Sequence, residues 1–431
     1  MPSEQPSATD EPAGRYAWPR ADFTRIPYGV YGDPAVYEQE QARIFRGSVW
    51  TYLALEAEIP EPGDYRVVFV GDTEVIVNRD RDGSLHAFVN RCAHRGAAIR
   101  RTHRGNATEH VCIYHQWSYD LAGRLVGVPF MRGVAGRGGV PATFSKSDHG
   151  LRTLRVESYR GVIFGSFDHS VGPLRDYLDA PVCAHLDRLM AKPLRILGYE
   201  RQRVQGNWKL YADNTRDPYH GGLLHLFQVT FGIYRNTHEG GTRISAGKGH
   251  NISFSRQGTD KEDAATAHKD VGTFQQGFSL QAPEILAYRD EFGDGVGLSI
   301  MAVFPNAVFH QIGNSLAVRQ IRPKGVAEFE LFWTFYGYAD DDADMTAHRL
   351  AQSNLAGPAG LISMEDGEAI ELVHRMLASG RDRHSVVEMG GAEPIETSSI
   401  LVSEIPMRGF WTQYASVMGI RPEAPAAGPT P

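Results

Sequence analysis

The chain has 431 residues, which is too long for a single ordinary hydrophobic core, so we expect about two or three domains. Hydrophobic residues make up 42% and charged residues 22%, as in most globular proteins, and the net charge of −7 argues against a nucleic-acid-binding or membrane-binding surface. No apolar run is long enough to cross a bilayer, and residues 1–20 lack the apolar core of a secretory signal. We therefore expect a cytoplasmic protein.

Both ends of the chain have the composition of disordered tails, which we predict at residues 1–20 and 421–431. A helix is predicted over Tyr37–Phe45, where apolar residues recur among Glu and Gln. From about residue 49 to residue 167, β-rich runs are separated by Gly-Asp and Asp-Gly turns, which is typical of a small all-β domain. Its predicted strands are Tyr65–Val70, Glu74–Asn78, Leu85–Asn90, Leu154–Tyr159 and Val162–Phe167.

From about Leu194 onward, strands alternate with longer helical stretches. This pattern predicts an α+β domain, in which a curved antiparallel sheet has helices on one side. The predicted strands are Ser299–Phe304, Ala307–Ile312, Ser315–Arg322 and Phe329–Tyr336. The predicted helices are Trp208–Phe227, with interruptions, and Glu365–Leu377.

The three cysteines are too few for a disulfide framework, and for Cys183 we predict a free, buried thiol. The other two belong to the motifs Cys92-Ala-His94 and Cys112-Ile-Tyr-His115, each of which offers one thiolate and one imidazole from a short loop. Two such loops can hold a Rieske-type [2Fe–2S] cluster, with both Cys on one iron and both His on the other. A single zinc ion takes the same four ligands and is the alternative, although the first spacing is not typical of zinc sites.

A second pair of possible metal ligands lies further along the chain. His220 and His225 are five positions apart, which separates two side chains by roughly 140° around an ideal helix. Pro218, Gly221 and Gly222 would bend or break that helix, so that both imidazoles could converge on one ion. Structural histidines are common at such spacings, so the residues alone leave both interpretations open.

The strings around these motifs resemble a known family. Asn90-Arg-Cys-Ala-His-Arg-Gly96 and Cys112-Ile-Tyr-His-Gln-Trp-Ser118 closely resemble the Rieske domain of bacterial aromatic-ring-hydroxylating oxygenases. Asn207-Trp-Lys, followed by Asp-x-Tyr-His-x₄-His ending at His225, resembles the mononuclear-iron motif of their large (alpha) subunits. The resemblance extends from about Arg25 to Gly419 and implies a helix-grip, START-like catalytic domain.

The resemblance also implies boundaries and ligands. We expect an N-terminal helical part of the catalytic domain at 21–47, the Rieske domain at 48–167 and the catalytic domain at 168–420. His220 and His225 become two ligands of a 2-His-1-carboxylate iron(II) site with positions open for oxygen. The family pattern of Asp before Gly in the last predicted helix favours one acid as the third ligand over its three neighbours. The favoured acid is Asp366, and the neighbours are Glu365, Glu368 and Glu371.

Three polar residues near the histidine pair follow from the same resemblance. Asp217 is expected to hydrogen-bond His220 and, across a subunit boundary, the cluster ligand His115 of a neighbouring copy. Asn214 is expected close to the iron. Asp213 stands where the family usually has Glu, so no role is carried over to it.

The resemblance is strongest to large subunits that act on single-ring aromatic carboxylates such as terephthalate, anthranilate and salicylate. In these relatives an Arg on a core strand binds the substrate carboxylate, and Arg319 matches that position. The stretch Pro394–Thr397 offers no basic residue for a second carboxylate, so a monocarboxylate is favoured over terephthalate. Monohydroxylation and cis-dihydroxylation both remain open.

The resemblance implies a terminal oxygenase that contains a Rieske [2Fe–2S] cluster and mononuclear Fe(II). The chain has no Gly-rich dinucleotide motif, so electrons are expected from a separate NAD(P)H-dependent reductase, directly or through a ferredoxin. A small (beta) subunit in an α3β3 assembly is also implied. A basic cluster beside the first cluster loop is a hypothetical docking site for an acidic donor; it comprises Arg95, Arg100, Arg101 and Arg104. The alternative function is a Rieske electron carrier without oxygenase activity.

Overall fold

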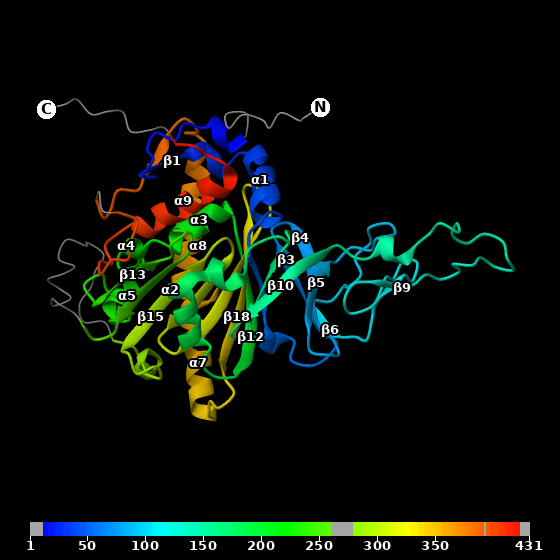
Figure 1. Cartoon of the computed structure of the whole chain (residues 1–431). Coiled ribbons are helices and arrows are strands. Elements are labelled where there is room, and N and C mark those ends of the chain that lie inside the picture. Colours follow the sequence, from blue (N-terminus) through cyan, green and yellow to red (C-terminus); the bar gives the residue numbers. More distant parts are fainter. Residues whose placement is uncertain (1–11, 260–278, 392–393, 423–431) are drawn as a thin grey trace. The chain divides into compact units, whose positions relative to one another are not determined.

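The computed structural model describes residues 12–259, 279–391 and 394–422. The chain folds into two compact units, shown in Figure 1. The larger unit comprises Met1–Ile44 and Arg175–Pro431, and the smaller comprises Phe45–Leu174. No described helix is both long and apolar enough to cross a membrane.

The N-terminal segment is ordered earlier than the sequence predicts. Pro12–Arg15 form a 3₁₀ helix, and Trp18 is 2% exposed. The Trp18 indole donates to the Ala13 carbonyl oxygen at 3.1 Å and packs 5.8 Å from the Trp411 ring. The predicted disordered tail is therefore wrong for residues 12–20, because one buried tryptophan holds this segment despite its polar composition. The rest of that tail, and the C-terminal tail from residue 423, lie outside the described residues.

The smaller unit is all β, as predicted. Its seven-stranded sheet has the order β2-β11-β10-β5-β4-β3-β6, and a second sheet has the order β7-β8-β9. The neighbouring strands in both sheets are antiparallel. The strands are β2 (Thr51–Leu55), β3 (Asp64–Val70), β4 (Thr73–Arg79), β5 (Leu85–Val89), β6 (Arg104–Asn106), β7 (His110–Val111), β8 (Ser118–Tyr119), β9 (Leu125–Gly127), β10 (Thr153–Tyr159) and β11 (Val162–Ser166).

The larger unit contains a seven-stranded antiparallel sheet with the order β12-β18-β17-β16-β15-β14-β13. The predicted strands correspond to β15–β18, and β16 has the predicted bounds. The strands are β12 (Leu194–Val204), β13 (Gly240–Ile244), β14 (Asn251–Arg256), β15 (Val296–Val303), β16 (Ala307–Ile312), β17 (Ser315–Pro323) and β18 (Phe329–Tyr338). A separate two-stranded sheet pairs β1 (Arg25–Pro27) with β19 (His384–Val386).

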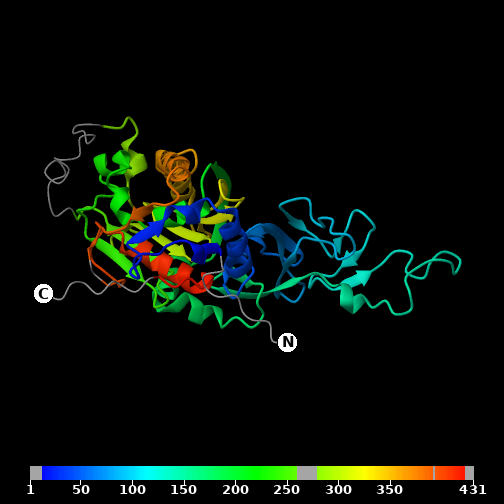
Figure 2. The same ribbon diagram turned by 90° about the horizontal axis from the view of Figure 1, so that it is seen from above.

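Helices cover both faces of this sheet, and in Figure 2 the strands lie between α8 (orange) and α2 (green). Tyr211 of α3 bonds Arg319 on one face, whereas His185 of α2 lies 3.2 Å from Ser299 on the opposite face. The sequence pattern does not predict α2, because Asp179 and Pro181 interrupt its helical geometry. The helices are α1 (Pro34–Glu40), α2 (Leu174–Leu189), α3 (Trp208–Asn214), α4 (Pro218–Gly221), α5 (Leu226–Thr230), α7 (Ala343–Ala356), α8 (Leu361–Leu377) and α9 (Ile405–Met418).

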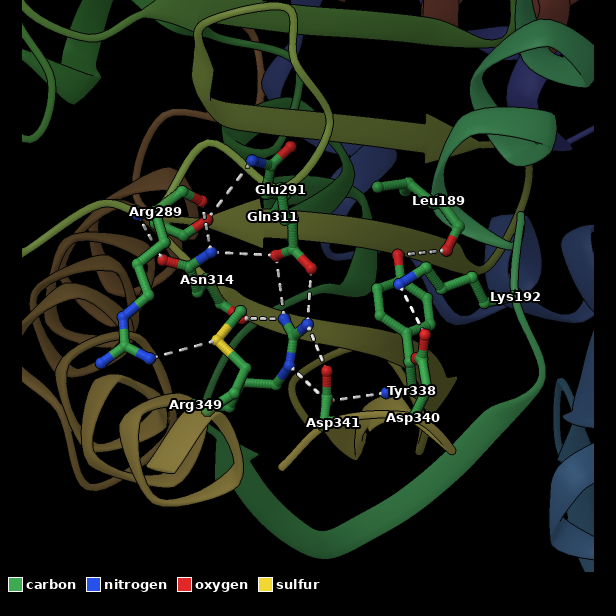
Figure 3. A network of polar contacts seen from close by, with 12 residues as sticks. Leu189, Lys192, Arg289, Glu291, Gln311, Asn314, Tyr338, Asp340, Asp341 and Arg349 are labelled. Carbon is green, nitrogen blue, oxygen red and sulfur yellow. Dashed lines mark hydrogen bonds and ion pairs between the residues drawn. The ribbon is translucent and has the colours of Figure 1, made fainter. Parts of the chain in front are cut away.

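One ionic network fixes the segment that follows residue 278 (Figure 3). Arg349 of α7 is 1% exposed and pairs with Glu291 at 2.5 Å and with Asp341 at 2.8 Å. Its guanidinium also donates to the Asn314 carbonyl oxygen in the β16–β17 turn at 2.6 Å. Because both carboxylates bond the same guanidinium, the pairing compensates for burying its charge. The network holds Leu286 of the same segment against the hydrophobic cluster beside the site described next.

Candidate metal centres

The two loops that carry the Cys-His motifs have the same backbone structure. In the first loop, the Gly96 amide donates to the Cys92 carbonyl oxygen and the Cys92 amide donates to Ala97. In the second loop, Gln116 donates to Cys112 and Cys112 donates to Trp117 in the same pattern. The fifth residue of each loop has a positive φ, 78° at Gly96 and 58° at Gln116, which turns the chain back sharply. The two loops therefore hold their Cys and His side chains on equivalent backbone turns.

In both loops the thiols are buried, whereas His94 is exposed and His115 is half-buried. Cys92 and Cys112 are 3% and 2% exposed, and burial, together with the neighbouring Cys92, raises the pKa of Cys112. The His94 ring stacks on Trp117 at 4.7 Å and lies 4.7 Å from the His115 ring. Below the loops, the Tyr119 hydroxyl contacts Cys92 Sγ at 3.2 Å. This layered donor set fits a cluster with thiolates on an inner iron and imidazoles on an outer iron.

The spacing of these four side chains disfavours the zinc alternative. Ligands of one tetrahedral zinc ion lie within about 4 Å of one another. Among the described residues, the one group that brings three metal-ligating atoms within 4.8 Å of one another is His220, His225 and Asp366. The Cys-His set is more widely spread, as a two-iron cluster requires.

The second centre forms where α4, α5 and α8 meet. Oδ1 of Asp366 lies 3.4 Å from Nε2 of His220 and 3.3 Å from Nε2 of His225. His220 belongs to the single turn of α4, and His225 precedes α5. Because the chain breaks between these short helices, the roughly 140° separation expected on a continuous helix does not apply. The structure thus brings together the three side chains that the sequence singled out.

The electrostatics of this trio suit a cation. Burial opposes a charge on His220, but Asp217 and Asp366 outweigh it and raise its pKa to about 10. Burial acts to raise the pKa of Asp366, yet the two imidazoles hold it well below its usual range. Both pKa shifts have one physical cause, the attraction between the imidazoles and the carboxylates around them. Two imidazoles and one carboxylate are also the donor set of non-haem iron(II) sites.

Each histidine of the trio has a second carboxylate behind it. Asp217 Oδ2 lies 3.3 Å from Nδ1 of His220, and Glu365 Oε2 lies 2.8 Å from Nδ1 of His225. Such contacts fix the ring and its tautomer, so that both Nε2 atoms face Asp366. Glu365 is therefore placed behind His225 and not at the meeting point. The sequence alone predicts Glu365 only as a possible ligand.

Of the other polar residues that the sequence singled out, only some contact the trio. Asn214 Nδ2 donates to Asp366 Oδ1 at 2.9 Å and lies 3.3 Å from His220 Nε2, so Asn214 is part of the centre. Glu368 is exposed, and Glu371 accepts a bond from the Gln205 amide at 3.1 Å. Asp213 points away, toward the Tyr31 hydroxyl and the Trp411 indole.

Asp213 has a structural environment. Burial raises its pKa to about 7, although hydrogen bonds from Tyr31 and Trp411 act in the opposite direction. These two partners come from the N-terminal segment and from α9, so the carboxylate joins both to α3.

A cavity lined by all three side chains of the trio opens beside them. Its walls are mostly apolar, and a few polar groups project into it, as in many small-molecule sites. The apolar lining includes Tyr234, Leu298, Ile300, Ile312 and Ile362. The cavity is therefore suited to an aromatic or aliphatic body held next to the metal-binding side chains.

Arg319 contributes the permanent cation of this cavity. It is 4% exposed, and its Nη1 bonds the Tyr211 hydroxyl at 3.0 Å. Nε and Nη2 both donate to Nδ1 of His310, at 3.1 and 2.8 Å. The guanidinium also lies 4.3 Å from the centre of the Trp333 ring. Among the described residues, none of its partners is a carboxylate. The sequence did not predict the roles of Tyr211, His310 and Trp333, because they come from three separate elements.

The arginines of the hypothetical docking cluster differ in their exposure and in their contacts. Arg100 donates to His110 Nδ1 at 2.8 Å and to the Glu109 carbonyl oxygen at 2.6 Å, and it lies over the Tyr65 ring. Arg100 thus has internal contacts. Arg95 and Arg101 are exposed, although Arg95 lies 5.0 Å from the Tyr114 ring.

Comparisons with known proteins agree with this geometry. The Rieske [2Fe-2S] domain family matches residues 49–143, and the family described as "Ring hydroxylating alpha subunit (catalytic domain)" matches residues 185–420. The chain is 46% identical to the anthranilate 1,2-dioxygenase large subunit of Burkholderia cepacia, covering 96% of this chain and 97% of that one. It is 38% identical to the large oxygenase component of salicylate 5-hydroxylase from Ralstonia sp., covering 93% and 96%.

A solved structure shares the fold. Naphthalene 1,2-dioxygenase from Rhodococcus sp., bound to indole, superposes with a TM-score of 0.76 at 26% identity and covers 94% of this chain and 95% of that one. The match to a catalytic domain also favours an oxygenase over an electron carrier. The resemblance inferred from the sequence motifs is thus confirmed. The chain belongs to the large (alpha) subunits of ring-hydroxylating oxygenases, a family whose members combine a Rieske [2Fe–2S] domain with a mononuclear-iron catalytic domain.

Proposed function

We propose that this chain is the large subunit of an oxygenase that hydroxylates a single-ring aromatic monocarboxylate. The observation that carries the proposal is Arg319, a buried cation with neutral partners, in the same apolar cavity as His220, His225 and Asp366. The two relatives described above are named for anthranilate and salicylate, both of which carry a ring carboxylate.

The surroundings of Arg319 leave its charge available to a ligand. Burial and the neighbouring guanidinium hold the pKa of His310 well below its usual range, so His310 is neutral and accepts two hydrogen bonds. Tyr211 and Trp333 are also uncharged, and they fix the plane of the guanidinium. A buried charge without a counter-ion is costly, and a carboxylate ligand would remove that cost. The fork of N–H groups on Arg suits a carboxylate better than an ammonium would.

Specific residues hold each metal group. Cys92, His94, Cys112 and His115 would hold the cluster, and His220, His225 and Asp366 would hold the mononuclear iron. When bound, these groups supply single-electron transfer and reductive activation of dioxygen. Asp217 and Glu365 orient the two imidazoles, and Asn214 donates to Asp366 Oδ1 and so restrains the third ligand. The apolar walls exclude water from the ring, and Arg319 sets its direction.

Electrons would come from a separate NAD(P)H-dependent reductase, with or without a ferredoxin. We further propose a small (beta) subunit and an α3β3 assembly in the cytoplasm, as the sequence resemblance implies. In this assembly, Asp217 would bridge His220 to His115 of the neighbouring subunit, and the two centres would work as a pair between chains.

Iron counting tests the ligand assignment. The parent chain is expected to bind about three irons, two in the cluster and one in the catalytic domain. Asp366→Asn should reduce the content to about two and leave the absorption spectrum of the cluster unchanged. Glu368→Gln, on the exposed face of the same helix, is the matched control and should keep all three. Equal iron contents in D366N and the parent would exclude Asp366 as a ligand.

A variant of Glu365 tests whether this residue is a metal ligand or only orients the ligand His225. Glu365→Gln keeps the shape of the side chain but removes the charge behind His225, so it should weaken iron(II) binding by about tenfold. Unlike D366N, it should regain full iron content at high iron(II) concentration. Titration of the metal-free catalytic site measures both effects. A permanent loss of one iron in E365Q would make Glu365 itself a ligand.

Arg319→Met tests the carboxylate assignment. The variant should raise KM for benzoate-type substrates about 100-fold, on the order of 2.7 kcal/mol, because the ligand charge loses its partner in a buried site. Its iron content should not change. Arg322→Gln, on the same strand, is the control, because Arg322 pairs with Glu330 at 2.9 Å. An unchanged KM in R319M would contradict the proposed substrate class.

Co-expression tests the pairing between chains. Cys92→Ser removes the cluster and Asp366→Asn removes the mononuclear site, so each variant alone should be inactive. If a cluster serves the iron of its neighbour, random mixed trimers should recover roughly a quarter of the parental activity per chain. Separately purified variants, mixed without reassembly, provide the background. Mixed trimers that stay at that background would show that each chain uses its own two centres.

A further inference from the structure

Gln228 is a polar side chain that the centres described above do not use. It lies on α5, three positions after His225, and is 3% exposed while lining the cavity. Its backbone carbonyl accepts from the Ile233 amide at 2.9 Å, which fixes the position of the residue. Among the described residues, its side-chain amide has no hydrogen-bond partner. Because Gln228 lines the cavity, its amide can hydrogen-bond a ligand that fills the cavity.

Ser253 is a second polar group on the cavity wall. It is 7% exposed, and its hydroxyl has one long contact, 3.5 Å from Nδ2 of Asn251. Strand β14 places it opposite Ile300, which is opposite His310 on β16. Two strand spacings, about 10 Å, therefore separate Ser253 from the residue that holds Arg319. Ser253 and Arg319 mark two ends of one sheet face.

The wall between these ends is apolar. Ile300 lies between Ser253 and His310 in the same row, and Leu298 and Ile312 continue the surface in the next row. A flat ring fits against such a wall, and its carboxylate can reach Arg319. The opposite part of the ring then faces the end of the cavity that contains Ser253.

We propose that Gln228 and Ser253 form a second polar subsite, which binds a neutral hydrogen-bonding substituent, hydroxyl or amino, on the ring of a carboxylate held by Arg319. This inference rests on the proposed function and names its substrate class more closely. The subsite does not suit a second anionic group, because no lysine and no arginine other than Arg319 lines the described part of the cavity. A glutamine amide offers both a donor and an acceptor, and a serine hydroxyl does the same.

Ligand binding to the iron-loaded enzyme without an electron donor tests the subsite. Dissociation constants are measured by calorimetry for benzoate and for its 2-, 3- and 4-hydroxy and 2-, 3- and 4-amino derivatives. In the parent, at least one derivative should bind about tenfold more tightly than benzoate, which is the effect of one added hydrogen bond in a buried site. The isomer that gains most identifies the ring position that reaches the subsite.

Gln228→Met keeps the length of the side chain and removes its hydrogen bonds. The variant should lose the tenfold gain, while its affinity for benzoate stays within about threefold of the parent. Ser253→Ala should lose part of the gain. Thr230→Val, on the same helix but not part of the cavity lining, is the control and should keep the parental preference.

The outcomes separate the two proposals. A parent that binds no derivative more tightly than benzoate would overturn the subsite, and so would a Q228M variant that keeps the gain or weakens every ligand equally. In each of these cases, weak benzoate binding by R319M would show that the carboxylate assignment still holds. An R319M variant that binds benzoate as the parent does would instead reject the proposed function.

Discussion

The catalytic domain depends on one oxygen atom, Oδ1 of Asp366, which faces Nε2 of His220 and Nε2 of His225 at 3.4 and 3.3 Å. Two breaks in the helical chain allow this meeting. Pro218 and Gly222 confine α4 to a single turn, and a second break places His225 before α5. The carboxylates of Asp217 and Glu365 then turn the two imidazoles toward the same point. The helix breaks lower the local stability of this segment. Because of these breaks, the three ligand side chains can converge on one point.

The catalytic domain contains two buried arginines, Arg349 and Arg319, that differ in the charge of their partners. Arg349 is buried on one side of α7 and is neutralised by Glu291 and Asp341, so its role is to hold structure together. Arg319 is equally buried, but its partners are His310, Tyr211 and Trp333, which carry no charge. The contrast between the two arginines is informative, because the same chain compensates one cation internally and leaves the other to a ligand.

The sequence predicts what is local in this structure. Strand β16 is a short run that contains Val, Phe and Ile and lies between Pro305-Asn306 and Gly313-Asn314, so its bounds, Ala307–Ile312, follow from the pattern. The Cys-His loops are short motifs, and their ligands can be read directly. Asp366 has three acidic neighbours in the sequence, and only the resemblance to the family identifies it as the third metal ligand. Gln228 and His310 carry no sequence signal of their own, because their meaning arises from strands and helices that meet across the fold.

Asp217 shows that local folding and site geometry use the same atoms. Its Oδ1 caps α4 by accepting from the Tyr219 and His220 amides, while its Oδ2 contacts the His220 ring. A single helical turn is not stable alone, so α4 depends on this cap and on hydrogen bonds to the Pro218 carbonyl oxygen from Tyr234 and Asn236. The same Tyr234 lines the cavity. The turn, the metal ligands and the substrate wall are therefore one cooperative unit, and whatever orders the ligands also shapes the cavity.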